Sequence, residues 1–423
     1  MNRIIILGNG FDLAHGLNTS YNSFISNFWN RLIQKVMNSP AHERYIDDFL
    51  DIRKTPENWY PECSWERFEN FKASLKGVNS ILKFRNDFLK ELSNHLGSTN
   101  WVDIEESYYK LLKLSYSKTQ KSKTSIDTLN QNFQTFKDLL EEYLELQVKD
   151  FTVDNSTTIN IGRNIYEDFN FNHFCSSVQN AKIEREYQKV EKYLKNLTDK
   201  EDIQNIQPYQ DQFLLESVYD LKQDPLKLNL KIRELILSEY ASEYFNLCPS
   251  EVLFLNFNYI ETERYYLKPS KFRELLYHQK PRVTINHIHG LIKNQQNPMI
   301  FGFGDELDED YKKIESLNNN EYLKNVKSIN YLETTNYKKL LEFIESDYFQ
   351  IGIMGHSCGI SDRTLLNTLF EHSNCGSIKI HYHKRSDGSD NYSDVVRNIS
   401  RNFNDKAMMR DKVVNKIWSN PIL

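Results

Sequence analysis

Four short polar motifs follow apolar runs and contain residue types that bind nucleotides or catalyse hydrolysis. The first motif contains Gly8, Asn9, Gly10, Phe11 and Asp12, with Gly16 shortly after it. Glycines at a strand-to-helix turn let backbone N–H groups approach a phosphate, and the following helix N-terminus adds a positive dipole. Its spacing differs from that of a dinucleotide fingerprint and from a Walker loop. The motif predicts a nucleotide-binding turn, with a simple tight turn as the alternative.

The second motif, Asn256-Phe257-Asn258-Tyr259, comes directly after a strongly apolar run. The Asn258 amide can both donate to and accept from a ribose hydroxyl or a bound water. Asparagine also tolerates left-handed backbone, so a plain turn residue is the alternative.

The third motif is Asn286-His287-Ile288-His289-Gly290. On a strand, residues 287 and 289 face the same side. Three interpretations stay open: a structural histidine pair, a metal-binding pair, and a general base at His289 with room for substrate at Gly290. No third ligand of suitable spacing is evident, so no metal is predicted.

The fourth motif runs from Gly355 through His356, Ser357 and Cys358 to Ser361 and Asp362. Small residues and hydroxyls at a strand-to-helix turn suit ribose or phosphate binding. The glycine-serine spacing also resembles a nucleophile elbow, but little sheet remains downstream to hold an acid and a histidine. Helix capping by Ser361 and Asp362 is the structural alternative, and it is compatible with ligand contact.

Strands alternating with helices must position these motifs. Residues 3–8 form a short, continuously apolar run that is typical of a buried parallel strand. Further strands are predicted at residues 252–257, 283–288, 299–303, 348–354 and 377–382, with helices at 336–346 and 363–372. This alternation predicts a parallel sheet, and ligands bind at the carboxyl ends of its strands. We expect one α/β domain from residues 1–20 and 250–423, with a helical insertion at 21–249.

The insertion shows helical periodicity. Apolar residues from Ile126 to Tyr143 recur three and four positions apart, which predicts a helix. Another helix start is expected near Trp101, with Asp103 as cap and Glu106 completing a capping box. Residues 117–125 are predicted to be a loop, and the string at 334–337 a helix cap rather than an active-site motif.

Composition excludes several classes of protein. The 423 residues include 13% aromatics, which argues against disorder, and the net charge of −5 gives no general attraction for duplex nucleic acid. The five cysteines are scattered without a C-x-x-C pair, which indicates a reducing compartment. No signal peptide or membrane span is evident, so a soluble, cytoplasmic protein is expected.

The strings from Leu7 to Asp12, Phe257 to Tyr259, His287 to Gly290 and Gly355 to Asp362 resemble, in this order, the AbiH family of bacteriophage abortive-infection proteins. The string Trp101-x-Asp103-Ile104-Glu105 resembles the same family. The likeness spans nearly the whole chain and implies a role in defence against phage.

A weaker resemblance to sirtuin-like NAD hydrolases bears on chemistry. It lies in the spacing of Gly8, Gly10 and Gly16, and in Asn258, the His289-Gly290 pair and Gly355-x-Ser357. It implies a Rossmann-like (sirtuin-like), mostly parallel sheet with NAD as substrate, Asn258 orienting water or the ribose, and His289 as base. The motifs and this resemblance together predict the nucleotide-binding residues Gly8, Asn9, Gly10, Phe11, Asp12, Gly16, His287, Gly290, Gly355, His356, Ser357 and Asp362.

Two departures limit this second resemblance. Ile260 stands where such hydrolases usually carry an acid, and no cysteine quartet for a structural zinc is present. The missing zinc site disfavours a protein deacetylase and leaves NAD cleavage open. Two other functions remain: a non-catalytic nucleotide sensor, and a metal-dependent hydrolase that uses His287 and His289. A phage or host protein is the expected trigger, and a homo-oligomer is compatible with the sequence.

Overall fold

The fold is that of a computed structural model, which describes residues 1–38, 44–53, 82–94, 101–116, 125–272, 280–303, 306 and 308–423. A five-stranded sheet forms its centre, and every neighbouring pair of strands is parallel. Its strands are β1 (Asn2–Leu7), β5 (Glu251–Asn256), β6 (Arg282–His287), β7 (Phe349–Met354) and β8 (Cys375–His381). The strand order is β6-β5-β1-β7-β8, so the chain reverses direction across the sheet between β1 and β7. The predicted α/β class and parallel sheet are confirmed.

The first strand lies at the centre because its side chains are apolar on both faces. Ile4 and Ile6 pack on one face, in a cluster with residues of α14 (Asn336–Ser346), α15 (Arg363–Phe370) and α16 (Tyr392–Asn402). Ile5 and Leu7 pack on the other face, against α7 (Asn155–Ile165) and Phe11 of α1 (Asn9–Ala14). Successive strand side chains point to opposite faces, so a strand covered on both sides is continuously apolar.

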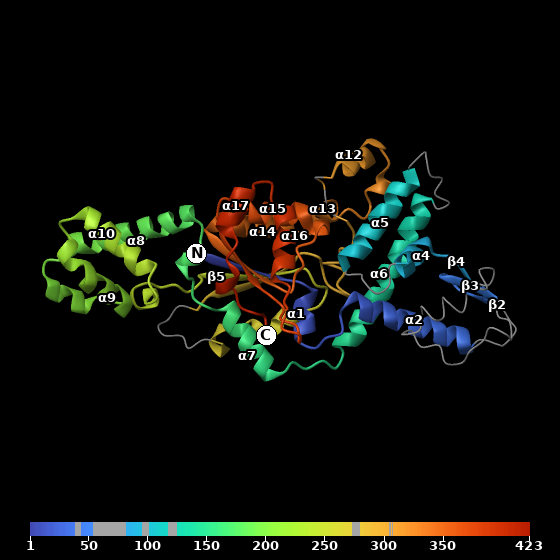
Figure 1. Ribbon diagram of the computed structural model, residues 1–423, viewed down its shortest axis with the longest axis horizontal. Helices are drawn as coiled ribbons and strands as arrows, with labels where there is room; N and C mark the ends of the chain where they lie inside the picture. The colour runs from blue at the N-terminus through green and yellow to red at the C-terminus, as the bar shows by residue number, and fades with distance from the viewer. Residues whose placement is uncertain are drawn as a thin grey trace.

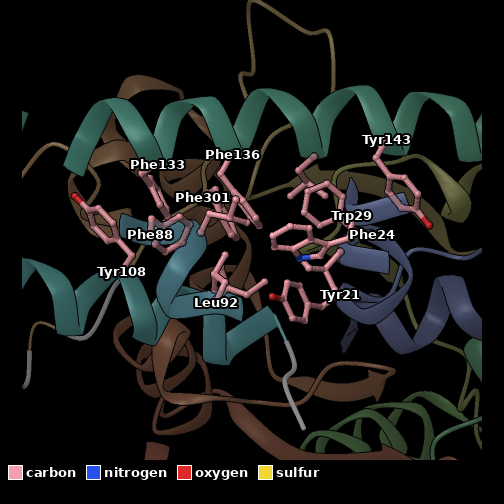
Figure 2. Packing of buried hydrophobic residues seen from close by; sticks show 14 of the residues in the cluster. Tyr21, Phe24, Trp29, Phe88, Leu92, Tyr108, Phe133, Phe136, Tyr143 and Phe301 are labelled. Atoms are coloured by element: carbon pink, nitrogen blue, oxygen red, sulfur yellow. The ribbon is translucent and has the colours of Figure 1, made fainter. Parts of the chain in front are cut away.

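A first lobe of inserted residues lies on one side of the sheet domain (Figure 1). Its elements are α2 (Tyr21–Asn38), β2 (Arg44–Ile46), β3 (Leu50–Arg53), β4 (Leu82–Phe84), α4 (Asp87–Asn94), α5 (Trp101–Tyr116) and α6 (Ile126–Val148). Ser125 caps α6 by accepting a hydrogen bond from Thr128 N–H, and the apolar stripe predicted from Ile126 to Tyr143 lies on this helix. The aromatic core of the lobe, shown in Figure 2, includes Phe301 from the sheet domain.

A second lobe lies on the opposite side of the sheet domain in Figure 1 and has a separate apolar core. Its helices are α8 (Ser176–Asn196), α9 (Tyr209–Val218), α10 (Pro225–Ile236) and α11 (Ala241–Tyr244). The inserted residues are therefore distributed over three places: the two lobes, and α7 between them on a face of the sheet. Three further helices, α12 (Glu309–Ser316), α13 (Lys327–Asn330) and α17 (Lys406–Lys412), belong to the part of the chain that follows β6.

Three sequence-based predictions of local structure are wrong. Residues 299–303 form no strand, and only Phe303 makes an isolated bridge, to Val326. Phe301 instead stacks on Phe133 of α6, with ring centroids 5.2 Å apart, so helices rather than a strand ladder bury this run. Asp103 lies within α5 and is not its cap. The first lobe also contains a small antiparallel sheet, β2-β3-β4, where only helices were expected.

Two sequence features cannot be compared with the fold. Residues 117–124 of the predicted loop lie outside the described residues, as does Cys63. The other four cysteines are free thiols. Among the described residues, no helix combines the length and apolar character that crossing a bilayer requires.

Candidate functional site

A cavity of about 460 Å³ lies at the carboxyl ends of β1, β5 and β7. All four polar motifs contribute to its lining, together with residues of the first lobe. The lining from the four motifs includes Gly8, Asn9, Gly10, Asp12, Asn258, His289, Gly355, His356, Ser357 and Asp362. The four motifs therefore converge at one edge of the sheet, as expected from the sequence.

The glycines of the first and fourth motifs allow the turns after β1 and β7 to pack backbone against backbone. A Cβ on Gly355, which has a φ of +73°, would stand 2.0 Å from Phe11 N. A Cβ on Gly8 would stand 2.5 Å from the His356 Cα, and one on Gly10 2.8 Å from the Gly355 Cα. No side chain fits at such distances, so these glycines are required by the contact between the turns.

This contact changes the expected role of the first turn in phosphate binding. Gly10 N–H donates to Gly355 O at 2.9 Å, and Phe11 N–H donates to Gly8 O at 2.8 Å. Both donors are thus used within the protein. The turn presents the Asn9 side chain instead, whose Oδ1 accepts a hydrogen bond from Thr19 at 2.6 Å.

Four of the predicted binding residues lie outside the cavity lining. Phe11 is buried in the core between the sheet and α7. Gly16, with a φ of +87°, follows α1 and ends it. Gly290 does not leave room for a substrate, because a Cβ there would stand 2.0 Å from Pro298 O. His287 is the last residue of β6, and its Nε2 lies 3.1 Å from Glu263 Oε1.

The two histidines of the third motif do not share a strand face, contrary to the sequence-based expectation. His289 lies in the turn after β6, and this turn directs it to the cavity. Its Nε2 is 3.2 Å from Asp362 Oδ1 and 3.1 Å from the Tyr331 hydroxyl. Because a carboxylate only accepts, the tautomer that suits Asp362 has the proton on Nε2 and the lone pair on Nδ1. In this tautomer Nδ1 can accept a proton.

Lys327 forms the centre of a buried charge network that includes Asp362, the carboxylate beside His289. Its ammonium lies 2.8 Å from Glu105 Oε1 and 2.8 Å from Asp362 Oδ1, and its side chain is 1% exposed. Burial opposes the charge on Lys327, but the two carboxylates outweigh burial and raise the pKa of the ammonium. Burial also opposes the charge on Asp362 and by itself would raise the pKa of this carboxyl. Lys327 and His289 nevertheless hold that pKa well below its usual value. Lys327 and Asp362 are therefore both charged.

Glu105 and His289 respond to the same network in different ways. Burial raises the pKa of Glu105 to about 7, against the attraction of Lys327. Burial lowers the pKa of His289 to about 4; Lys327 adds to this shift and Asp362 opposes it. His289 is consequently neutral at neutral pH and can accept a proton, but a pKa of about 4 makes it a weaker base than a free imidazole.

A second histidine flanks the same carboxylate. His356 Nδ1 accepts the Cys358 N–H at 3.0 Å, so its Nε2 carries the proton and lies 3.6 Å from Asp362 Oδ2. The Phe257 ring packs against both histidines, with centroids 4.9 Å from His289 and 4.3 Å from His356. Asp362 precedes α15 without capping it, and its carboxylate is instead held between two histidines and a lysine.

A protonated carboxyl and an amide form another part of the cavity wall. Burial raises the pKa of Asp12 to about 8; nearby Glu263 adds to this, while Thr262 and Asn258 oppose it. Asp12 Oδ1 and Asn258 Nδ2 have no hydrogen-bond partner of normal geometry in the described chain. The backbone of Asn258 is held by Asn256, whose Oδ1 accepts its N–H at 2.7 Å. The Asp12 carboxyl and the Asn258 amide therefore lie close to each other, and both residues line the cavity.

Sequence reasoning missed Glu105, Lys327 and Tyr331. Lys327 begins the four-residue helix α13, in a segment without periodic pattern, so nothing local marked it. Glu105 did lie in a string that resembles the AbiH family, but the expected function of that string was helix capping. In the ranges that the structure describes, no group of three or more His, Cys, Asp or Glu side chains is arranged to hold a metal ion.

Comparison with known families decides the chain's relationship. The family model for bacteriophage abortive infection AbiH matches residues 4–383. This chain belongs to the AbiH family. The match includes the four motifs, both lobes and Lys327, and it ends before the cavity residues Arg385, Asn391, Asp394, Val395 and Asn398. No curated protein and no solved structure matches the chain.

Proposed function

We propose that this AbiH protein acts in abortive infection by hydrolysing NAD at the nicotinamide–ribose bond. The observation that carries the proposal is the single cavity in which Asn258 and the buried His289–Asp362 pair meet. The strand order supports it, since in chain order it is third-second-first-fourth-fifth, as in doubly wound nucleotide-binding sheets. Such sheets bind ligands where the order reverses, which here lies between β1 and β7.

In the proposed reaction, the bond between ribose C1′ and the nicotinamide nitrogen breaks. The bonding electron pair stays with the nitrogen, so nicotinamide leaves as a neutral molecule. Water forms the new C1′–O bond, and His289 Nδ1 accepts the proton that the water releases. Asp362 accepts the Nε2 hydrogen bond and stabilises the imidazolium that results.

Other cavity residues would hold the substrate. The Asn258 amide, which lines the cavity beside Asp12, would donate to a ribose hydroxyl. Because Gly10 N–H and Phe11 N–H are already used, we assign the diphosphate to the Asn9 amide and to Arg385, which also lines the cavity. Lys327 is unsuited to this role because two carboxylates already neutralise it.

The test is nicotinamide release from NAD by purified protein, measured with and without extract of phage-infected cells. His289→Ala is expected to lower the rate by about 10²–10⁴-fold. His383→Ala is the matched control, because His383 is exposed and lies outside the cavity. Equal rates for wild type and His289→Ala, including under infection, would contradict the proposal.

A non-catalytic nucleotide sensor is the second candidate, and the pairing of Lys327 favours it. A lysine neutralised by two buried carboxylates stabilises a fixed structure whether or not chemistry follows. The inserted lobes would then contact a phage or host protein. Saturable NAD binding without nicotinamide release, unchanged in His289→Ala, would support the sensor over the hydrolase. A metal-dependent hydrolase predicts bound metal, which elemental analysis of the purified protein detects.

A further inference from the structure

A second cavity, of about 640 Å³, lies next to the first. It is formed by the end of α6, the segment 259–265 and the loop 291–296. The cavity is within the usual size range of small-molecule sites, about 300–1,000 Å³. Nothing in the function proposed above uses it.

Aromatic rings and cations share the lining of this second cavity. Phe151, Tyr259 and Tyr265 provide rings, while Arg264 and Lys293 provide positive charge. Glu261 is the one acid among its lining residues. The combination of flat apolar walls with two cations suits a ligand that has an aromatic ring and an anionic group.

Neither cation is tightly neutralised. The Arg264 guanidinium donates to the Tyr265 hydroxyl at 3.2 Å and lies 5.2 Å from the centre of that ring. Glu261 and Glu263 attract the Arg264 charge at longer range, without an ion pair to it among the described residues. Lys293 Nζ is 3.9 Å from Glu145, and both side chains are more than half exposed. Such an exposed pair is weak and leaves the ammonium available to an anion.

We propose that this second cavity binds a nucleotide, with the base between the rings and the phosphates at Arg264 and Lys293. The site is distinct from the NAD cavity, although Tyr259 and Ile260 line both. The nucleotide is identified here by its chemistry, a planar base joined to a polyanion. Its occupant is an effector, because the acid–base groups His289 and Asp362 lie only in the first cavity.

The shared wall gives the effector a route to His289. Ile292 N–H, from the loop of the second cavity, donates to Tyr259 O at 3.1 Å. The Tyr259 hydroxyl donates to Ile300 O at 3.2 Å, and its ring lies 6.4 Å from that of His289 at an angle of 25°. A ligand that shifts the loop therefore shifts the residue beside the proposed base. This coupling rests on the proposed function, whereas the binding does not.

Binding is tested by titrating full-length protein with the fluorescent nucleotide trinitrophenyl-ATP. The double variant Arg264→Gln/Lys293→Gln is expected to bind about tenfold or more weakly, since it loses two charge-assisted contacts. Lys268→Gln/Lys280→Gln removes the same charge from exposed positions outside the cavity and should bind as wild type does. Arg385→Gln reports binding in the first cavity.

Each outcome of the titration decides the proposal. Weakening in Arg264→Gln/Lys293→Gln alone supports the second site. Weakening in Arg385→Gln alone, equal loss in the exposed-lysine control, or no saturable binding overturns it. Competition adds an independent measure: ATP should displace the probe at lower concentration than adenosine or tripolyphosphate, because only ATP has both a base and an anion. Nicotinamide release with and without ATP then tests the coupling, and its absence leaves the binding result intact.

Discussion

Removing the Lys327 ammonium tests the buried charge network most directly. In Lys327→Met, the apolar replacement leaves two carboxylates facing each other without a cation. Glu105 and Asp362 are 6% and 7% exposed, so water cannot compensate for the lost contacts at 2.8 Å. Loss of one partner from a buried ion pair costs about 3–5 kcal/mol in the free energy of unfolding. We expect a loss in this range at pH 8.

The stability that Lys327→Met loses must depend on pH in a defined direction. The folded-state pKa of Glu105 is raised to about 7, above its unfolded value, so the stability gained by protonating it is present at low pH and disappears as pH rises through the folded pKa. Without Lys327 that pKa rises further, and Glu105 is protonated at pH 6. The loss in Lys327→Met should therefore be about 1–2 kcal/mol smaller at pH 6 than at pH 8.

The assay is urea unfolding followed by tryptophan fluorescence at both pH values. Lys324→Met is the matched control, because Lys324 is 61% exposed and lies 3.7 Å from Glu321. Adding Glu105→Gln to Lys327→Met removes one of the two carboxylates left without a cation and should recover part of the stability. If Lys327→Met unfolds at the same urea concentration as Lys324→Met, or if its loss is greater at pH 6, the reasoning is refuted.

Three further predictions concern the cavity walls and the residues that support them. Asp12→Asn should flatten the dependence of stability on pH. The folded-state pKa of Asp12 is raised to about 8, so the wild type loses stability as pH rises from about 4 to 8. Urea midpoints across that range measure the slope, and an unchanged slope in Asp12→Asn contradicts the prediction. Gly355→Ala should lower the melting temperature strongly, since its Cβ would stand 2.0 Å from Phe11 N at a positive φ; Gly388→Ala, also at positive φ but in open space, should cost less. Asn256→Ala removes the donor 2.7 Å from buried Glu263 Oε2, together with the contacts of Asn256 to Ile260 O and Asn258 N–H. It should cost about 1–3 kcal/mol in urea unfolding, and a loss within error of zero would show that the Asn256 side chain contributes little.

The strands and the strand-end motifs could be predicted because their signals are local. A continuously apolar run such as that of β1 needs no distant information to indicate a buried strand, and a polar motif at its end marks the carboxyl edge. The same logic fails at residues 299–303, where the apolar run is equally clear. Phe301 is buried by α6 rather than by a neighbouring strand, and only the tertiary structure distinguishes the two environments.

The charge network could not be predicted because its members are far apart in the chain. Lys327 reaches Glu105 across 222 residues and Asp362 across 35, and neither separation leaves a periodic pattern. The glycines were recognised as important, but for a different physical reason. Their small size serves the contact between two turns, which the sequence does not distinguish from close approach to a phosphate.

The participation of Glu105 also changes what the first lobe does. Its carboxylate comes from α5, yet it neutralises a lysine that contacts the partner of His289. The stacking of Phe301 on Phe133 fixes the same lobe to the segment that follows His289, and Figure 2 shows both rings within the core of the lobe. A movement of α5 away from the sheet would leave Lys327 paired with Asp362 alone and would open the cavity to water. The first lobe is therefore part of the site, because the cavity's electrostatics require it to stay in place.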